Sequence, residues 1–218
     1  NLSSPRGLTF TIHDKEKWVN HVKAMTPYTN GARMLVKFML FAAHDGAKPD
    51  IKAAGLIQRK DAAPDSSTEF LSFDAWDKDL YATLEHVAPQ NTQSRGWKGV
   101  YDEQDLKDTI GNFILLPKGQ NSALKDADWG VKKLFLCVLL SDSQKSREDY
   151  IKEAKVSGVS LPSSIEKAVL TSDGKYPLIK SHMLSGLENV DDWDANFIKK
   201  RSGRLCELVW DRMEDWLT

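Results

Sequence analysis

The dipeptide Glu85-His86 places a carboxylate directly before an imidazole, within the stretch 84–90. His86 is the one histidine of five in the chain that follows an acidic residue, and Pro89 comes three residues later. A histidine with an ordinary pKa of about 6.5 is neutral at working pH and can take a proton from water. A carboxylate supplies the oxygen ligands that a hard divalent cation prefers. The two neighbours therefore have the residue types needed for metal-assisted hydrolysis.

Two asparagines farther along the chain could complete this pair. Asn112 directly precedes four large apolar residues, 113–116, and this run predicts a short buried strand. Asn121 lies in a polar turn ahead of a helix that we expect over 123–140. A long polar connection over 88–109 separates the first pair from this strand, and loops of that length are often functional. The order is strand, loop, strand, turn and helix, as in a ββα-metal site.

In this order, the chain carries the segments LEHVAPQ, IGNFILLP and KGQNSAL. Together they resemble the HNH endonuclease domain at the C-terminus of GmrSD-type restriction proteins. Members of that family typically show acid-His-Ile-x-Pro-Gln, then Ile-Gly-Asn-Leu-x-Leu-Leu, then Asn-Ser and a lysine-rich helix. The resemblance covers residues 76–140 closely and 193–216 more loosely. The looser part is similar to the family's closing pattern in Trp193, Ile198, Arg201, Leu205 and Trp210.

The resemblance implies a metal-dependent DNA endonuclease that uses Mg²⁺ or Mn²⁺. His86 would be the general base, and Glu85 and Asn121 would be the metal ligands. Asn112 would orient the His86 ring through a hydrogen bond. Such an all-oxygen ligand set favours magnesium or manganese over zinc. Neighbouring side chains in a strand point to opposite faces, so we expect the backbone to bend at Glu85-His86 if both are to reach one phosphate.

The sequence departs from the commonest HNH pattern in its last position, where many members have a histidine. Asn121 stands in the corresponding turn, and Asp126 and Asp128 are reserve candidates for the metal. Each residue also has a simpler interpretation: His86 as a structural histidine, Asn112 as a turn residue, and Asn121 as a helix N-cap. Capping and metal binding by Asn121 are compatible.

Several cations are candidates for DNA contacts, although a solvated helix face is the more ordinary interpretation of each. They are Lys132 and Lys133 on the helix after the turn, and Lys199, Arg201 and Arg204 near the C-terminus. Four cations fall within 199–204, and such a group can contact a DNA backbone. Trp97 in the long connection could stack on a base, but we expect a core tryptophan.

The overall composition limits the function classes. The chain has 218 residues and a formal net charge of −1, whereas nucleic-acid-binding domains are often strongly basic. Any phosphate contact must therefore come from a local patch. Two cysteines without a CxxC motif exclude a four-cysteine zinc site and fit a cytoplasmic location. No apolar run approaches the ~20 residues of a membrane span, so we expect no membrane association.

Hydrophobic spacing predicts a mostly helical protein around the short strands. We expect helices within 14–27, from 31 to about 44, over 144–156, from about 162, and over the last 25 or so residues. Trp76, Leu80 and Leu84 lie at helical spacing, but the chain could equally become extended toward residue 87. The predicted fold class is α+β and mostly α-helical, with a ββα-metal (HNH) motif embedded in a helical domain.

We divide the chain into a helical N-terminal segment (1–75), the HNH motif (76–140) and a helical C-terminal extension of the same domain (141–218). The chain begins without a methionine. The resemblance implies an upstream nucleotide-hydrolysing or modification-sensing domain, in a bacterial restriction or anti-phage defence protein that acts on DNA. One alternative is a catalytically inactive module that binds DNA or a partner protein. Another is a nuclease directed at RNA.

Overall fold

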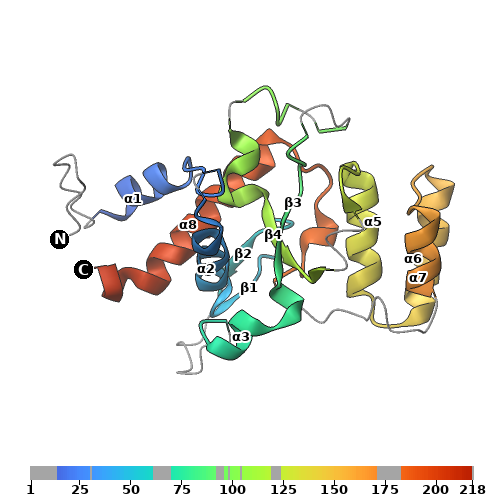
Figure 1. Ribbon diagram of the computed structural model, residues 1–218, viewed down its shortest axis with the longest axis horizontal. Helices are drawn as coiled ribbons and strands as arrows, with labels where there is room; N and C mark the ends of the chain where they lie inside the picture. Colours follow the sequence, from blue (N-terminus) through green and yellow to red (C-terminus); the bar gives the residue numbers. More distant parts are fainter. Residues whose placement is uncertain are drawn as a thin grey trace.

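A two-stranded antiparallel hairpin lies near the middle of the computed structural model, with helices on both sides (Figure 1). The structure describes residues 14–29, 31–60, 70–91, 96–97, 99–103, 105–118, 124–170 and 183–217. In the hairpin, β3 (Thr83–His86) pairs with β4 (Phe113–Leu116), and His86 lies opposite Phe113. The predicted strand over 113–116 is confirmed.

Residues 76–84, whose sequence allowed either a helix or an extended chain, do not form one continuous helix. Helix α3 (Phe73–Asp77) is short, and its N-cap Ser72 accepts a hydrogen bond from the Ala75 backbone amide. A 3-10 turn, η1 (Asp79–Tyr81), follows, and the chain then extends into β3. The helix that contains Trp76 therefore ends at Asp77, and Leu80 lies in the 3-10 turn before the strand.

All four residues of β4 are buried, because each face of the strand meets a different hydrophobic cluster. Ile114 and Leu116 belong to one cluster, and Phe113 and Leu115 belong to the other. Alternating side chains of a strand point to opposite faces, so one strand can join two cores. The continuous apolar run in the sequence follows from this double burial.

The first cluster is built around α5 (Trp129–Leu140), with α6 (Gln144–Val156) and α7 (Ser163–Leu170) packed in turn beyond it (Figure 1). The predicted helix over 123–140 begins only at Trp129, where the Asp128 side chain accepts a hydrogen bond from the Val131 amide. The charged helix expected over 144–156 is confirmed.

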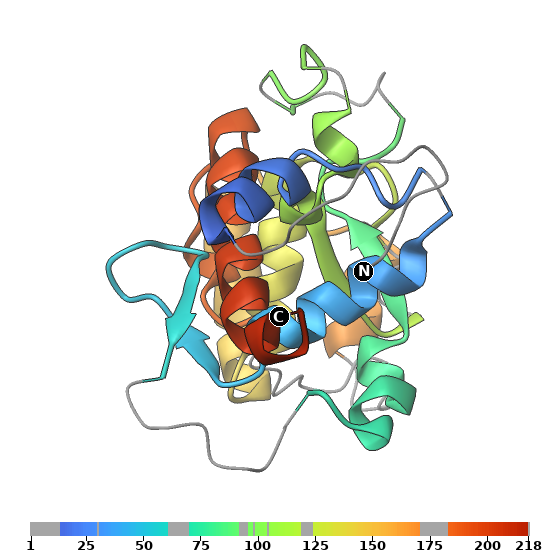
Figure 2. The same ribbon diagram turned by 90° about the vertical axis from the view of Figure 1, so that its left-hand side faces the viewer.

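The second cluster lies between α8 (Ala195–Leu217) and α2 (Arg33–His44), with α1 (Lys15–Val22) beside α8 (Figure 2). Asp14 caps α1, as its sequence position predicts. Helix α8 has 23 residues, which corresponds to about 34 Å. Its length lets it contact α1, α2 and the turn that leads into β4.

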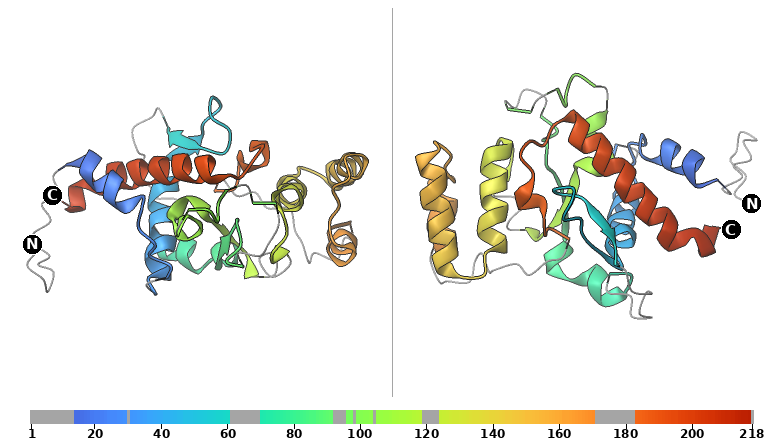
Figure 3. Two further views of the ribbon diagram at one scale, coloured as in Figure 1. Left: turned by 90° about the horizontal axis from the view of Figure 1, so that it is seen from above. Right: turned by 180° about the vertical axis from the view of Figure 1, so that it is seen from behind.

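A second small hairpin, β1 (Ala47–Pro49) with β2 (Ile57–Arg59), flanks α8 on the side away from β3 and β4 (Figure 3). The described part of the chain also contains the 3-10 turns η2 (Leu106–Asp108), η3 (Ile110–Asn112) and η4 (Leu187–Asn189). The predicted α+β, mostly helical class is confirmed. Among the described residues, no helix is both long and apolar enough to cross a membrane.

Candidate active site

His86 ends β3 with its ring enclosed by two aromatic side chains. The ring centroids of Tyr28 and Phe113 each lie 4.5 Å from the His86 centroid, at interplanar angles of 84° and 61°. Phe113 is its partner across the hairpin, and Tyr28 comes from the segment between α1 and α2. Burial lowers the pKa of His86, although the neighbouring carboxylate of Asp108 opposes this shift. The imidazole is therefore suited to being neutral at working pH.

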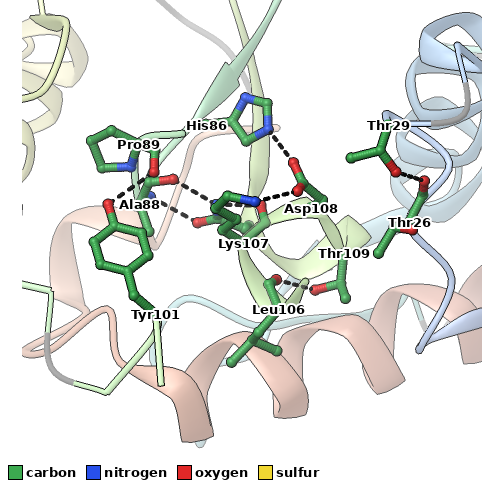
Figure 4. Close-up of polar contacts among 11 residues, drawn as sticks. Thr26, Thr29, His86, Ala88, Pro89, Tyr101, Leu106, Lys107, Asp108 and Thr109 are labelled. Atoms are coloured by element: carbon green, nitrogen blue, oxygen red, sulfur yellow. Dashed lines mark hydrogen bonds and ion pairs between the residues drawn. The ribbon is translucent and has the colours of Figure 1, made fainter. Parts of the chain in front are cut away.

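The direct partner of the His86 ring is Asp108, at the end of η2 (Figure 4). His86 Nε2 lies 3.0 Å from Asp108 Oδ1, and Asp108 is only 1% exposed. Lys107 Nζ donates to the second carboxylate oxygen, Oδ2, at 2.6 Å. Sequence reasoning missed Asp108, because it lies 22 residues after His86 in a polar connection without periodicity.

Glu85 points to the other side of the hairpin, toward α5. Its Oε1 accepts a hydrogen bond from Lys132 Nζ at 2.6 Å, and the same ammonium donates to the His86 carbonyl at 3.0 Å. Lys132 is 2% exposed, and Trp97, which is buried as expected, holds its ring 5.6 Å from the ammonium. Burial raises the pKa of Glu85 and lowers the pKa of Lys132, and the ion pair opposes both shifts.

The bend expected at Glu85-His86 is not found. β3 keeps regular pairing through His86, and the Val87 amide donates to the Asn112 carbonyl directly after it. The two side chains therefore lie on opposite faces: Glu85 faces α5, and His86 faces Phe113 and Tyr28. Charge from Lys132 still affects His86, because it contributes to lowering the pKa of the ring.

Asn112 lies near His86 but is not hydrogen-bonded to its ring. The fully buried amide donates to the carbonyls of Ala88 at 2.8 Å and Lys107 at 2.7 Å. Its oxygen accepts from the Ala88 amide at 2.8 Å and from Trp193 Nε1 at 3.1 Å. The predicted hydrogen bond from Asn112 to the ring is therefore wrong. Asn112 instead ties the segment after His86 to the segment before Asp108.

Two residues of the C-terminal pattern form hydrogen bonds to the turn that contains Asn112. Trp193 donates to Asn112, and Arg201 Nη1 donates to the carbonyls of Gly111 and Phe113, both at 2.8 Å. Arg201 is 3% exposed, and burial lowers the pKa of its guanidinium to about 9. Arg201 is thus removed from the set of surface cations that we predicted to contact DNA.

The other predicted DNA-binding cations also have partners. Lys132 is buried against Glu85, so it too is not a surface cation. The three that reach solvent form ion pairs with acidic side chains. These pairs are Lys133 with Asp191 at 3.5 Å, Lys199 with Glu103 at 2.6 Å, and Arg204 with Asp50 at 3.2 Å.

The possible metal ligands are oxygen donors near Glu85. Asn121, the predicted amide ligand, lies outside the described residues. Asp126 accepts a hydrogen bond from the Asn91 side chain at 2.9 Å, and its charge contributes to raising the pKa of Glu85. Asp128 is engaged as the N-cap of α5. Within the described ranges, no three His, Cys, Asp or Glu residues form a group that could hold a metal ion.

The comparison with known protein families gives one match. The sequence pattern that defines the C-terminal domain of GmrSD restriction endonucleases matches residues 37–208. This range includes β3, β4, α5 and more than the first half of α8. A search of curated proteins found no match.

Proposed function

The chain belongs to the family of GmrSD restriction endonuclease C-terminal domains, and from this we propose that it is a metal-dependent DNA endonuclease domain. Membership of this family supports the assignment of the chain as a nuclease module of restriction enzymes. The finer assignment, with Mg²⁺ or Mn²⁺ and with His86 as the base, is our proposal. One observation carries it: a buried histidine ends β3 and is hydrogen-bonded to the carboxylate of Asp108.

We propose that oxygen donors on the α5 side of the hairpin hold a hard divalent ion. Glu85 and Asp126 offer carboxylate oxygens on the α5 side of the hairpin, and oxygen is the ligand that magnesium prefers. Lys132 donates to Oε1 of Glu85, and we propose Oε2 as the ligand atom. Asn121 is proposed as a further ligand. A bound ion would neutralise charge on the phosphate and on the departing oxygen.

His86 would supply the proton transfer. Its neutral ring takes one proton from an attacking water, whose oxygen forms a bond to phosphorus as the bond to the 3′-oxygen breaks. The departing 3′-oxygen then takes a proton from solvent, so charge and atoms balance. Tyr28 and Phe113 exclude water from two sides of the ring, and Asp108 and Asn112 set its surroundings.

Plasmid nicking tests this proposal. The wild-type chain with Mg²⁺ or Mn²⁺ should convert supercoiled DNA to the nicked form, and His86→Ala should lose this activity by about 100-fold or more. Circular dichroism confirms that the variant is folded. Equal cleavage by the two proteins would show that His86 is not the base.

The metal dependence separates the roles of the two neighbours. High Mn²⁺ concentration should partly restore cleavage by Glu85→Ala, because the remaining ligands still bind the ion weakly. It should not restore cleavage by His86→Ala, because that variant lacks the proton acceptor. Cleavage rates over a metal titration measure the difference. The same response to added metal in both variants would contradict the division of roles.

In the cell, we propose that the domain is the effector of a bacterial restriction or anti-phage protein located in the cytoplasm. An upstream nucleotide-hydrolysing or modification-sensing domain would select the DNA. Restriction of phage by a full-length protein that carries His86→Ala would argue against nuclease action as its biological role.

A second candidate function is a non-catalytic module that binds a partner protein. The ion pairs of Lys133, Lys199 and Arg204 favour it, because cations already paired with carboxylates attract DNA weakly. Binding without cleavage under any divalent ion would select this alternative. Parallel incubation with DNA and RNA distinguishes the DNA endonuclease and the non-catalytic module from a nuclease that acts on RNA.

A further inference from the structure

We propose that Asp108 is a positioning residue that keeps the proton of His86 on Nε2 and leaves Nδ1 to accept the proton from water. This inference rests on the proposed function and deepens it. It assigns a role to a residue in the connection between the two strands, which the sequence pattern around His86 does not include.

The geometry of the pair specifies which nitrogen carries the proton. An ionised carboxylate only accepts hydrogen bonds, so the 3.0 Å contact between Asp108 Oδ1 and Nε2 requires a hydrogen on Nε2. Lys107 donates to the other oxygen at 2.6 Å, which suits an ionised carboxylate. In a neutral ring, Nδ1 is then the nitrogen with a free lone pair. Figure 4 shows that this nitrogen points away from Asp108.

The surroundings hold the ring and the carboxylate in one arrangement. Tyr28 and Phe113 enclose the His86 ring, each at a centroid distance of 4.5 Å, so a ring flip would meet both. Asp108 is 1% exposed and has little room to choose another rotamer. A buried pair fixed on both sides is what a proton acceptor of defined orientation requires.

The backbone on either side of the pair is fixed by Asn112. Its amide bonds to Ala88, two residues after His86, and to the carbonyl of Lys107, directly before Asp108. One buried side chain therefore sets the separation between the two partners. At the start of the same turn, Asp105 has a φ of 62°, a left-handed conformation that non-glycine residues seldom adopt.

The substitution Asp108→Asn tests the inference because it changes the hydrogen-bond pattern and not the shape. The Lys107 ammonium can donate only to the amide oxygen, so the amide nitrogen is turned toward His86. That nitrogen donates to Nε2, which forces the ring proton onto Nδ1 and blocks the atom proposed as the base. We expect single-turnover cleavage of supercoiled plasmid with Mn²⁺ to fall by about 100- to 10,000-fold, with DNA affinity unchanged.

A second readout needs no activity. Nitrogen-15 spectra of the histidine rings, recorded without metal or DNA, should show His86 protonated on Nε2 in the wild type and on Nδ1 in Asp108→Asn. The matched control is Asp105→Asn, which makes the same chemical change at an exposed position of the same turn. Asparagine also tolerates the left-handed conformation, so this control should keep the wild-type tautomer and rate.

Two results would overturn the proposal: an unchanged His86 tautomer in Asp108→Asn, or a cleavage rate within about threefold of wild type. Failure of the nuclease proposal itself has a different signature. Wild-type protein would then cleave nothing, while the ring spectra still report whether Asp108 sets the tautomer.

Discussion

The ion pair between Lys132 and Glu85 is buried, with Lys132 2% and Glu85 7% exposed. Removing one member of such a pair leaves the other charge buried without compensation, whereas removing both leaves only apolar or neutral groups. We therefore expect Lys132→Met to lower the free energy of unfolding by about 3–5 kcal/mol. The double variant Glu85→Gln with Lys132→Met should recover most of this loss.

Urea unfolding at neutral pH measures the effect of both variants. Lys133→Met is the control, because Lys133 lies one position along α5 and forms an ion pair with the exposed Asp191. Its effect should stay within about 0.5 kcal/mol. Additive losses from the two substitutions at Glu85 and Lys132 would contradict a strong coupling between them.

We expect the buried ring of His44 to make the stability of the protein depend on pH. Its ring is buried at the end of α2, where Nδ1 donates to the Leu40 carbonyl at 2.7 Å. Burial lowers the pKa of His44 from 6.5 to about 4. The unfolded chain therefore takes up a proton below pH 6.5 that the folded chain does not.

His44 therefore makes its full contribution to the free energy of unfolding above pH 6.5. This contribution is lost as the pH falls toward 4. The loss should reach roughly 3 kcal/mol. Urea unfolding of the wild type and of His44→Gln at pH 7, 6, 5 and 4 measures it, since the difference between the two isolates His44. Parallel pH curves for the two proteins would exclude this origin.

The site residues could be predicted from the sequence where they belong to a motif. They could not be predicted where burial in the folded chain decides their role. Glu85 and His86 stand out in the sequence, but Asp108 reaches the ring only through folding of the long connection. Lys132 carried a signal that we did not use. It lies three residues after Trp129 and four before Leu136, both buried, so helical spacing puts it on the apolar face of α5. The same spacing from Ile198 and Leu205 marks Arg201.

At the scale of elements, the contact between η3 and α8 depends on one glycine. The Gly111 amide donates to Ser202 Oγ at 2.9 Å, and a Cβ built on Gly111 would lie closer than 3 Å to backbone atoms of both Ile198 and Ser202. Gly111→Ala should therefore push η3 away from α8 and destabilise the protein by about 1–3 kcal/mol.

Gly203, in the middle of α8, provides the opposite case. A Cβ there meets no described atom within 4 Å, so Gly203→Ala should stabilise the protein by up to about 1 kcal/mol through helix propensity. Thermal unfolding compares the two variants. Equal effects of the two alanines would show that close packing of η3 on α8 contributes nothing.

Elements with strong local patterns were predicted well. α2 and β4 are apolar along almost their whole length, and their positions were clear from the sequence. β1 and β2 were not anticipated, because each has three residues and exists only through pairing with the other and packing on α8. The start of α5 was misplaced by six residues, since Asp128, and not Asn121, forms its cap.

At the scale of the whole molecule, balanced charge limits the attraction for DNA. The chain has a net charge of −1, and three of the candidate DNA-binding cations, Lys133, Lys199 and Arg204, form ion pairs with acidic side chains. Glu103→Gln should release Lys199, strengthen binding to a DNA duplex and steepen the salt dependence of log K by about 1.

Fluorescence anisotropy with a labelled duplex at several salt concentrations, without divalent metal, measures this change. Adding Lys199→Gln to Glu103→Gln should return binding to the wild-type level. If Glu103→Gln leaves both affinity and salt dependence unchanged, then the surface around Lys199 is not where DNA binds.

The dependence of the β3–β4 hairpin on α8 also has a consequence for synthesis of the protein. The ribosome makes β3 and β4 about 100 residues before the end of α8, whose Arg201 and Ser202 hold the turn that carries Asn112. At a synthesis rate of roughly 5–20 residues per second, Arg201 and Ser202 are made about 5–20 s after the hairpin. The site that we propose on this hairpin therefore cannot form before α8 has been synthesised.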